Sequence, residues 1–318
     1  MGIKNLNKFI RNNCPDVFEE IHISQYSYKK IAIDISLYLC KFKSICGDRW
    51  LTAFINLVTC LRKYEVHCIF VYDGKALGDK DEEKKKRAEQ REKTEDKITK
   101  LEIAMEHCNL TGEVDQILID LYKKKTKDME RPKRMMKKNP SSPSIQIDLK
   151  FLENVIKKMR SQVLDISESD FKLTRDLFDI LNIPYTTAPT EAECFCSYLC
   201  IKGHVDGVLS EDTDVMCYKA PVFLSKINTS DGTCTRVKYE DLLESLGLTC
   251  DQFLDQCIMC GTDYNKNIFR VGPETSYKLI QQHGSIEGIE NNTKHDTSIL
   301  KHQRVRELFR IFDETCKV

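Results

Sequence analysis

The sequence predicts an α/β fold with a mostly parallel, twisted central sheet flanked by helices. Short apolar stretches rich in β-branched residues, such as "KKIAID" and "VHCIFVYD", have continuous rather than alternating hydrophobicity, which is typical of strands buried on both faces of a parallel sheet. Helical patterns such as "RWLTAFINLVTCLRKY" and "FKLTRDLFDILNI" lie between these stretches. The alternation of strand and helix indicates a doubly wound arrangement with right-handed crossovers.

The composition allows a sizeable core but predicts no global attraction to nucleic acid. The chain has 318 residues, of which 41% are hydrophobic, as in ordinary globular proteins. Lys plus Arg and Asp plus Glu both number 49, so the formal net charge is zero. Any surface that binds nucleic acid must therefore be local.

The cysteines and the apolar runs indicate a soluble, intracellular protein. Fifteen cysteines, an odd number, are scattered along the chain, which fits a reducing compartment better than a disulfide framework. Cys257 and Cys260 form one CxxC pair without a matching second pair, so we interpret them as core thiols, with zinc as the alternative. No stretch resembles a signal peptide or approaches the roughly 20 apolar residues that span a bilayer. We expect no membrane contact, and a location in the nucleus or the cytoplasm.

Acidic residues follow three of the predicted strands. Asp34 and Asp73 end the first two, and "VDGVLSEDTD" carries Asp212 and Asp214. In open parallel sheets the ligand site lies beyond the carboxyl ends of the strands, because loops and helix amino termini converge there. One such acid is as often a turn or N-cap residue, but three strands that end in this way favour a site.

Two glutamates and one further aspartate extend the set to seven. Glu191 and Glu193 stand where a helix should begin, and Asp263 follows the helical "DQFLDQCIMCG". The alternative interpretation of "TEAE" is a capping box, in which Thr190 caps the helix and Glu193 reaches back. Seven clustered carboxylates would repel one another unless cations neutralised them. Mg²⁺ prefers such oxygen ligands, and two ions roughly 4 Å apart can clamp both the attacking and the leaving oxygen of a phosphodiester.

Several motifs resemble, in order along the chain, those of the flap endonuclease and XPG-type 5′ nuclease family. The motifs are "MGIKNL", "IAID", "FVYDGKA", "IPYTTAPTEAEC", "LSEDTDV", "CGTDY" and "GPETSYKLIQQHGSIEGI". Membership implies a PIN-like α/β core, a helical arch insertion and a helix-hairpin-helix element that grips duplex DNA. It also implies two Mg²⁺ ions, with Mn²⁺ as a substitute.

The resemblance assigns roles to particular residues. The predicted metal ligands are Asp34, Asp73, Glu191 and Glu193 in one group and Asp212, Asp214 and Asp263 in the other, and Asp34, Asp73, Glu193 and Asp214 also count as catalytic. Lys80 and Arg87 match the arch residues that contact the scissile phosphate. They are seven residues apart, nearly two helical turns, and would share one face; the alternative is that both belong to a solvated basic run.

The resemblance also implies contacts with duplex DNA. Gly2, Lys80, Arg87, Gly272, Thr275 and Lys278 are the predicted DNA-binding residues. Gly272 is expected to permit a tight turn before a helix whose amino terminus faces a phosphate, and hairpins of this family can hold K⁺. Arg270 replaces the usual first glycine of the hairpin, and Glu274 stands where a basic residue is common; plain packing of the two helices is the alternative.

These assignments divide one composite nuclease domain into four segments. Residues 1–75 form the N-terminal half of the core, 76–165 the charged helical arch, 166–254 the internal half of the core, and 255–318 the helix-hairpin-helix region with a C-terminal helix. The end of the chain, "RELFRIFDETCKV", carries no clear sliding-clamp motif. We expect a monomer.

The predicted function is that of a Mg²⁺-dependent, structure-specific 5′ nuclease. Its substrate would be branched or flapped DNA, cut at junctions between single strand and duplex during replication, repair or recombination, by flap endonuclease or 5′–3′ exonuclease activity. An endoribonuclease with the same site is one alternative, since single-stranded RNA could pass the same arch. A non-catalytic protein that binds junctions as a scaffold is the other, although a decayed site would be expected to lose some of its acids.

Overall fold

The computed structural model describes residues 2–75, 78–129, 148–163 and 166–310. The chain divides into two compact units, one made of residues 1–83 and 166–318 and the other of residues 84–165. The described residues of the first unit form two hydrophobic cores, and those of the second unit form one.

The first unit is built on a seven-stranded sheet with the order β1-β7-β6-β5-β2-β3-β4. The strands are β1 (Glu19–His22), β2 (Lys30–Asp34), β3 (His67–Tyr72), β4 (Tyr185–Thr187), β5 (Gly207–Leu209), β6 (Val222–Ser225) and β7 (Thr233–Lys238). The five strands from β6 to β4 are parallel, whereas β7 pairs antiparallel with both β6 and β1. The mostly parallel sheet is confirmed, and the antiparallel edge is a feature that the sequence did not predict.

The central strands are buried on both faces, as their continuous hydrophobicity predicts. In β2, Ile31 and Ile33 point into one core, while Ala32 between them points into the other. In β3, Phe70 belongs to the first of these cores and Val71 to the second. Because side chains alternate along a strand, each face of the sheet carries a separate layer of helices.

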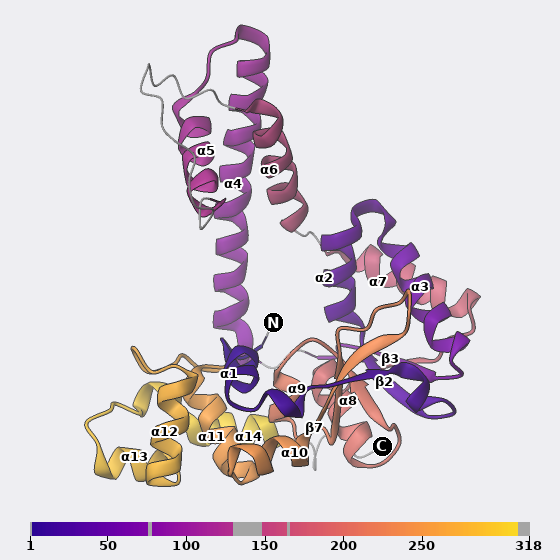
Figure 1. Ribbon diagram of the computed structural model, residues 1–318, viewed down its shortest axis with the longest axis vertical. Coiled ribbons are helices and arrows are strands. Elements are labelled where there is room, and N and C mark those ends of the chain that lie inside the picture. Colours follow the sequence, from indigo (N-terminus) through magenta and orange to yellow (C-terminus); the bar gives the residue numbers. More distant parts are fainter. Residues whose placement is uncertain (1, 76–77, 130–147, 164–165, 311–318) are drawn as a thin grey trace, which may run out of the picture. The chain divides into compact units, whose positions relative to one another are not determined.

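Two groups of helices cover these faces (Figure 1). Helices α2, α3 and α7 contribute to the core that contains Phe70, and α1 and α8 to α14 contribute to the core that contains Val71. Their bounds are α1 (Leu6–Asn13), α2 (Ile35–Cys46), α3 (Trp50–Lys63), α7 (Glu168–Ile180), α8 (Ala192–Ile201), α9 (Asp214–Cys217), α10 (Tyr239–Leu246), α11 (Cys250–Cys260), α12 (Pro273–His283), α13 (Ile286–Asn292) and α14 (His302–Arg310).

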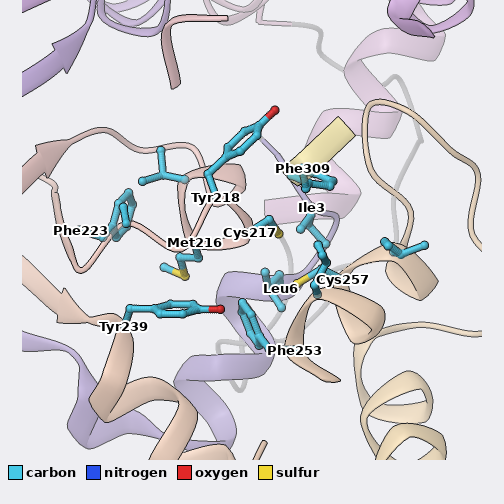
Figure 2. Packing of buried hydrophobic residues seen from close by; sticks show 14 of the residues in the cluster. Ile3, Leu6, Met216, Cys217, Tyr218, Phe223, Tyr239, Phe253, Cys257 and Phe309 are labelled. Atoms are coloured by element: carbon cyan, nitrogen blue, oxygen red, sulfur yellow. The ribbon is translucent and has the colours of Figure 1, made fainter. Parts of the chain in front are cut away.

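The amino terminus is part of the larger core. Figure 2 shows Ile3 and Leu6 near Cys217 of α9 and Cys257 of α11. All four side chains are almost fully buried. This packing ties the start of the chain to the segment after β5, in which Asp212 lies in a loop and Asp214 begins α9.

The second unit is helical. It contains α5 (Gln116–Met129), α6 (Leu149–Gln162) and all but the first residues of α4 (Asp81–Thr111), and α5 and α6 lie alongside α4 (Figure 1). Its core is formed by Ile98, Leu101, Ala104, Met105, Cys108, Leu118, Leu121, Leu152 and Ile156. Arg160 of α6 also pairs with Glu102 of α4. The predicted arch segment, 76–165, includes residues 76–77, 130–147 and 164–165, which lie outside the described part of the chain.

The described helices and cysteines add two observations. No helix in the described residues is both long enough and apolar enough to span a bilayer.

Cys257 and Cys260 are free and buried, and the Cys260 thiol lies 3.3 Å from the Ser276 hydroxyl. This environment agrees with core thiols.

Candidate metal centre

The predicted acids gather at the carboxyl ends of four adjacent strands, β5, β2, β3 and β4. Asp34 ends β2 and Asp73 directly follows β3. Glu191 follows β4, and Asp212 follows β5. The chain leaves β2 toward β3 and β4 and later returns to β5 on the other side of β2. The site therefore lies at the switch point where α/β sheets bind ligands.

Asp34 is held by the first turn of α2. Its Oδ1 accepts hydrogen bonds from the backbone N–H groups of Ser36 (2.8 Å) and Leu37 (3.3 Å), so it is the N-cap of the helix. The Ser36 hydroxyl in turn donates to Oδ2 of Asp73 (2.5 Å). Burial, followed by repulsion from Asp73, raises the pKa of Asp34 to about 8.

Asp73 also fixes the start of α8. Its Oδ1 accepts a hydrogen bond from the Ala192 N–H (2.9 Å), and the N-cap residue Glu191 makes no side-chain capping bond. The alternative interpretation, a capping box formed by Thr190 and Glu193, is therefore wrong. A carboxylate from another strand satisfies the helix end, and both glutamates are left to face the site.

Gly74 allows the chain after β3 to come close to the chain after β4. Its N–H donates to the Thr190 carbonyl (2.6 Å), and a Cβ at this position would lie 1.9 Å from the Ala188 carbonyl oxygen. Only glycine fits this gap without displacing backbone. The glycine thus holds Asp73 beside the loop that carries Glu191.

The amino terminus contacts the aspartates after β5. The Ile3 N–H donates to Oγ1 of Thr213 (3.0 Å) and to Oδ1 of Asp214 (3.1 Å). Gly2 has φ +80°, and a Cβ on it would lie 2.1 Å from Oδ1 of Asp212. Gly2, a predicted DNA-binding residue, therefore packs directly against two predicted metal ligands.

Lys80 places a positive charge among the remaining acids. It ends the 3₁₀ turn Gly78–Lys80, and its Nζ lies 2.8 Å from Oε2 of Glu191, 3.3 Å from Oε1 of Glu193 and 3.7 Å from Oδ2 of Asp263. The side chain of Lys80 is only 12% exposed. Within the described structure, Lys80 is thus a counterion of the acid cluster.

The electrostatics confirm that the acids interact closely. Burial raises the pKa of Glu193, Asp212 and Asp214, and repulsion among the acids adds to the effect. For Lys80, burial opposes the charge, but Glu193 and Glu191 raise its pKa overall. Such a cluster favours a bound cation or bound protons over a set of bare carboxylates.

The chemistry of the donor set fits hard divalent cations. The seven side chains offer carboxylate oxygens, the ligands that Mg²⁺ and Mn²⁺ prefer, and the ammonium of Lys80 shows that three of them can converge on one positive charge. Within residues 2–75, 78–129, 148–163 and 166–310, no group of three or more His, Cys, Asp or Glu side chains is already spaced to hold an ion. Ion binding would therefore require that Lys80 and some of the carboxylates move.

The other predicted residues lie outside this cluster. Arg87 is exposed on α4 in the second unit, and its contact with a phosphate stays a prediction. Thr275 and Lys278 are exposed and three residues apart on α12, so they share one face. Both side chains are available to contact the phosphate backbone of DNA.

The hairpin before α12 differs from the expected one. Gly272 is the N-cap of α12 with φ −114° and ψ −173°, an extended conformation that any residue adopts. Arg270, with φ +62°, holds the left-handed position instead. The expectation that Gly272 permits the tight turn is wrong, although a DNA contact at Gly272 stays a prediction.

Sequence reasoning missed two tyrosines. The hydroxyls of Tyr218 and Tyr264 both lie within hydrogen-bond distance of Oε2 of Glu191. A signal was present, since Tyr264 directly follows Asp263 and Tyr218 lies four residues after Asp214. Their side-chain directions depend on packing that the sequence does not reveal.

Two family models match the chain. Residues 1–94 match the XPG N-terminal domain and residues 182–263 match the XPG I-region. The two matches contain all seven acids and Lys80.

Relatives from viruses and plants match nearly the whole chain. The probable RAD2-like endonuclease 076L of Invertebrate iridescent virus 3 is 34% identical, over 98% of this chain and 86% of the relative. Flap endonuclease 1 of Zea mays is 28% identical, over 98% of this chain and 75% of the relative.

Solved structures share the fold. The catalytic core of Rad2 in complex with DNA substrate has a TM-score of 0.59 at 17% identity, covering 98% of this chain and 80% of that one. Flap endonuclease-1 from Methanococcus jannaschii has a TM-score of 0.54 at 20% identity, covering 93% and 82%. The predicted PIN-like architecture is confirmed by these neighbours. The chain belongs to the RAD2/XPG family of flap endonucleases, which are phosphodiesterases.

Proposed function

We propose that this nuclease cleaves DNA at junctions between single strand and duplex, with two Mg²⁺ ions held by its seven acids. The observation that carries the proposal is the convergence of carboxylates from four adjacent strand ends, together with Lys80 as an internal counterion. So many acids in one place are stable only when cations or protons offset their charges. The DNA substrate of Rad2 and the flap endonuclease relatives support the choice of a DNA junction.

The ligands form two groups. Asp34, Asp73, Glu191 and Glu193 would hold one ion, and Asp212, Asp214 and Asp263 the other; Mn²⁺ offers the same charge and a similar preference for oxygen ligands. Bound ions would supply a water of lowered pKa as the nucleophile and stabilise the departing 3′ oxygen. The products would carry a 5′ phosphate and a 3′ hydroxyl.

The chain's own groups orient the reactants. Asp34 and Asp73 are pre-oriented by hydrogen bonds from Ser36 and from the start of α8, so little reorganisation would be needed at these two ligands. Lys80 would leave the carboxylates once their charge is offset, and would contact the scissile phosphate together with Arg87. Two cationic groups at this phosphate stabilise the charge that develops as it is attacked.

The duplex would be bound through its backbone. Thr275 and Lys278 present a hydroxyl and an ammonium on one face of α12, and Gly2 and Gly272 allow backbone to come close to DNA. Contacts of this kind position a duplex without reading its sequence, so specificity would come from the shape of the junction. A K⁺ ion at the hairpin is implied only by the family resemblance.

The biological setting follows from this activity. Flapped or branched DNA arises in replication, repair and recombination, so we expect the enzyme in the nucleus or at a cytoplasmic site of DNA synthesis. We expect the enzyme to act as a monomer.

A cleavage assay tests the proposal. The full chain is incubated with a 5′-labelled DNA flap, a nicked duplex and a matching RNA strand, in Mg²⁺ or in EDTA. Metal-dependent cutting at the base of the flap is expected, with a loss of at least about 100-fold for Asp212→Asn. Asp241→Asn is the matched control, because this aspartate lies on α10 beside Lys238 rather than in the cluster. Full activity of Asp212→Asn, or a strong preference for RNA, would overturn the proposal.

A further inference from the structure

Two buried tyrosine hydroxyls meet on one carboxylate oxygen of the acid cluster. The Tyr264 hydroxyl lies 2.6 Å from Oε2 of Glu191, and the Tyr218 hydroxyl lies 3.2 Å from the same atom. The two hydroxyl oxygens are 2.9 Å apart. The two tyrosines and Glu191 therefore form a closed triangle of oxygen atoms.

The number of available hydrogen atoms determines which of these three contacts are hydrogen bonds. Each hydroxyl carries one hydrogen, so two hydrogens serve three close contacts. The two shorter distances favour a chain in which Tyr218 donates to Tyr264 and Tyr264 donates to Glu191. In such a chain each hydrogen bond polarises the next, and the carboxylate receives a charge-assisted bond from Tyr264.

Packing holds both rings in place. Phe309 of α14 lies against Tyr218 (ring centroids 4.8 Å apart) and meets Tyr264 edge-on (5.4 Å, 86°). Figure 2 shows Tyr218 beside Phe309, with its hydroxyl directed away from Met216 and Tyr239. The exposed fractions of Tyr218 and Tyr264 are only 2% and 9%. Neither hydroxyl can be directed elsewhere without disturbing this packing.

Helix α14 is itself anchored. Arg306, one turn before Phe309, bonds both carboxylate oxygens of Asp255 (2.6 Å each) and also pairs with Glu287. A bidentate pair of this kind fixes the geometry of both groups. The position of Phe309, and with it the two tyrosines, is thus set by an ion pair outside the acid cluster.

Tyr264 also contacts the cation of the cluster. Lys80 Nζ lies 4.9 Å from the centroid of the Tyr264 ring and 2.8 Å from Oε2 of Glu191. The hydroxyl of Tyr264 therefore acts on the carboxylate, and its ring face acts on the ammonium. One side chain contacts both a proposed metal ligand and a proposed phosphate contact.

A purely structural role does not account for this arrangement. Hydroxyls that only needed partners in the core could bond each other and stop there. Glu191 is 9% exposed and does not cap α8 with its side chain, so its described donors are these hydroxyls and Lys80. If Lys80 leaves for the phosphate, the tyrosines would still orient the carboxylate.

We propose that Tyr264 and Tyr218 are positioning residues that hold Glu191 in the orientation in which it ligates an ion. The inference rests on the proposed function, because Glu191 needs this orientation only as a ligand or as a neighbour of one. Hydrogen bonds from such outer partners to metal ligands commonly change ion affinity or activity 10- to 100-fold.

Three variants and one control test the inference in the full chain. Tyr264→Phe removes the hydroxyl and keeps the ring, Tyr264→Leu removes both, and Tyr218→Phe removes the far end of the chain of hydrogen bonds. Tyr239→Phe is the control, since it deletes a buried tyrosine hydroxyl that lies beside the thiols of Cys250, Cys217 and Cys257 rather than beside a carboxylate. Each variant is measured for Mn²⁺ binding by calorimetry, for kcat and KM on a DNA flap, and for melting temperature in EDTA.

The expected pattern separates positioning from packing. Tyr264→Phe should weaken Mn²⁺ binding and lower kcat by about 10-fold each, with KM for the flap within about twofold of wild type. Tyr218→Phe should show a smaller loss of the same kind, of about threefold, and it remains informative if Tyr264→Phe does not fold. Tyr264→Leu should raise KM as well, because Lys80 loses its ring contact. Tyr239→Phe should leave Mn²⁺ binding and kcat unchanged.

The outcomes distinguish the two proposals. Asp73→Asn alters a ligand of the same ion as Glu191 and serves as the reference. If Asp73→Asn weakens Mn²⁺ binding but the Tyr264 and Tyr218 variants bind it like wild type and differ only in melting temperature, the positioning role is overturned and the metal centre stands. If wild type and Asp73→Asn bind Mn²⁺ equally, both proposals fall.

Discussion

Nζ of Lys80 lies 2.8 Å from Oε2 of Glu191, the same oxygen that accepts the hydrogen bond from Tyr264. One carboxylate oxygen thus contacts both a cation and a hydroxyl group. The ammonium group of Lys80 offsets part of the negative charge of the acid cluster. Removing this group is therefore the most direct way to reveal the repulsion among the acids.

Lys80→Met should destabilise the protein in EDTA and increase its response to divalent ions. Loss of one partner of a buried ion pair typically costs about 3 kcal/mol, although here proton uptake by Glu193 would offset part of it. Ions that occupy the vacated position should restore stability, so the rise in melting temperature on adding Mn²⁺ should exceed that of wild type. Thermal unfolding with and without Mn²⁺ measures both effects, and an equal rise in the two proteins would contradict the counterion role. Flap cleavage should also fall, since Lys80 is a proposed phosphate contact.

Asp34→Asn should stabilise the metal-free protein at neutral and alkaline pH. The pKa of Asp34 is raised from 3.8 to about 8 in the fold, so between these pH values the folded state binds a proton that the unfolded state has lost. Stability therefore falls as pH rises through this range. Asparagine does not titrate and caps helices about as well as aspartate, so the gain near pH 8 should be roughly 1–3 kcal/mol. Denaturant unfolding in EDTA at pH 5 and pH 8 checks it; a variant that is less stable than wild type at both values would argue against the raised pKa.

Gly2→Ala should disturb the metal centre. The added Cβ would lie 2.1 Å from Oδ1 of Asp212 and 2.7 Å from Oδ1 of Asp214, so either the amino terminus or the aspartates must move. We expect a loss of cleavage of about 10-fold or more, because displacements of about 1 Å can have effects of this size or larger. Gly247→Ala is a matched control, with a positive φ of 62° but no atom within 4 Å of the added Cβ. Gly247→Ala should lower the free energy of unfolding by about 1 kcal/mol and leave kcat unchanged. If Gly2→Ala and Gly247→Ala had the same kcat, this steric role of Gly2 would be ruled out.

Lys278→Ala should weaken flap binding without slowing the chemical step. An exposed lysine that contacts a phosphate adds about one unit to the dependence of log affinity on log salt concentration. KM should therefore rise a few-fold at unchanged kcat, and the salt dependence should become shallower. Lys294→Ala, which alters an exposed lysine after α13, serves as the comparison. If both variants showed the same salt dependence of binding, Lys278 would not contact a phosphate of the duplex.

Arg270→Gly should stabilise the hairpin. Arg270 adopts φ +62°, a region that costs a residue with a side chain roughly 1 kcal/mol and costs glycine little. A rise in melting temperature equivalent to about 0.5–1 kcal/mol is expected. Lys301→Gly, at φ +48° before α14, should behave similarly and reports the size of the backbone effect alone. A lower melting temperature for Arg270→Gly would mean that the arginine side chain contributes more than its backbone conformation costs.

The sequence predicted those features of the fold and the site that depend on local patterns of residues. Continuous apolar runs located β2 and β3, and the acids that end them identified the edge of the sheet where the site lies. Positions at strand ends follow from topology alone, because parallel strands bring their carboxyl ends to one edge. The remaining acids stand at other element ends, and the family resemblance supplied the grouping of the seven acids and the role of Lys80.

What the sequence could not show depends on long-range contacts. The start of α8 is capped by Asp73, which lies 119 residues from Ala192, so the local capping box of Thr190 and Glu193 never forms. The hydroxyl of Tyr264 reaches Glu191 across 73 residues, and its ring is packed by Phe309. No local pattern reports which of several partners a side chain will choose when distant segments compete for it.

The wide spread of the acids along the chain has a consequence for synthesis in the cell. The first proposed ligand is residue 34 and the last is residue 263, and the packing of Tyr264 also involves Phe309. A chain still emerging from the ribosome lacks part of this set until residue 263 has been translated. A nascent chain that ends before residue 263 therefore cannot carry the complete metal centre that we propose.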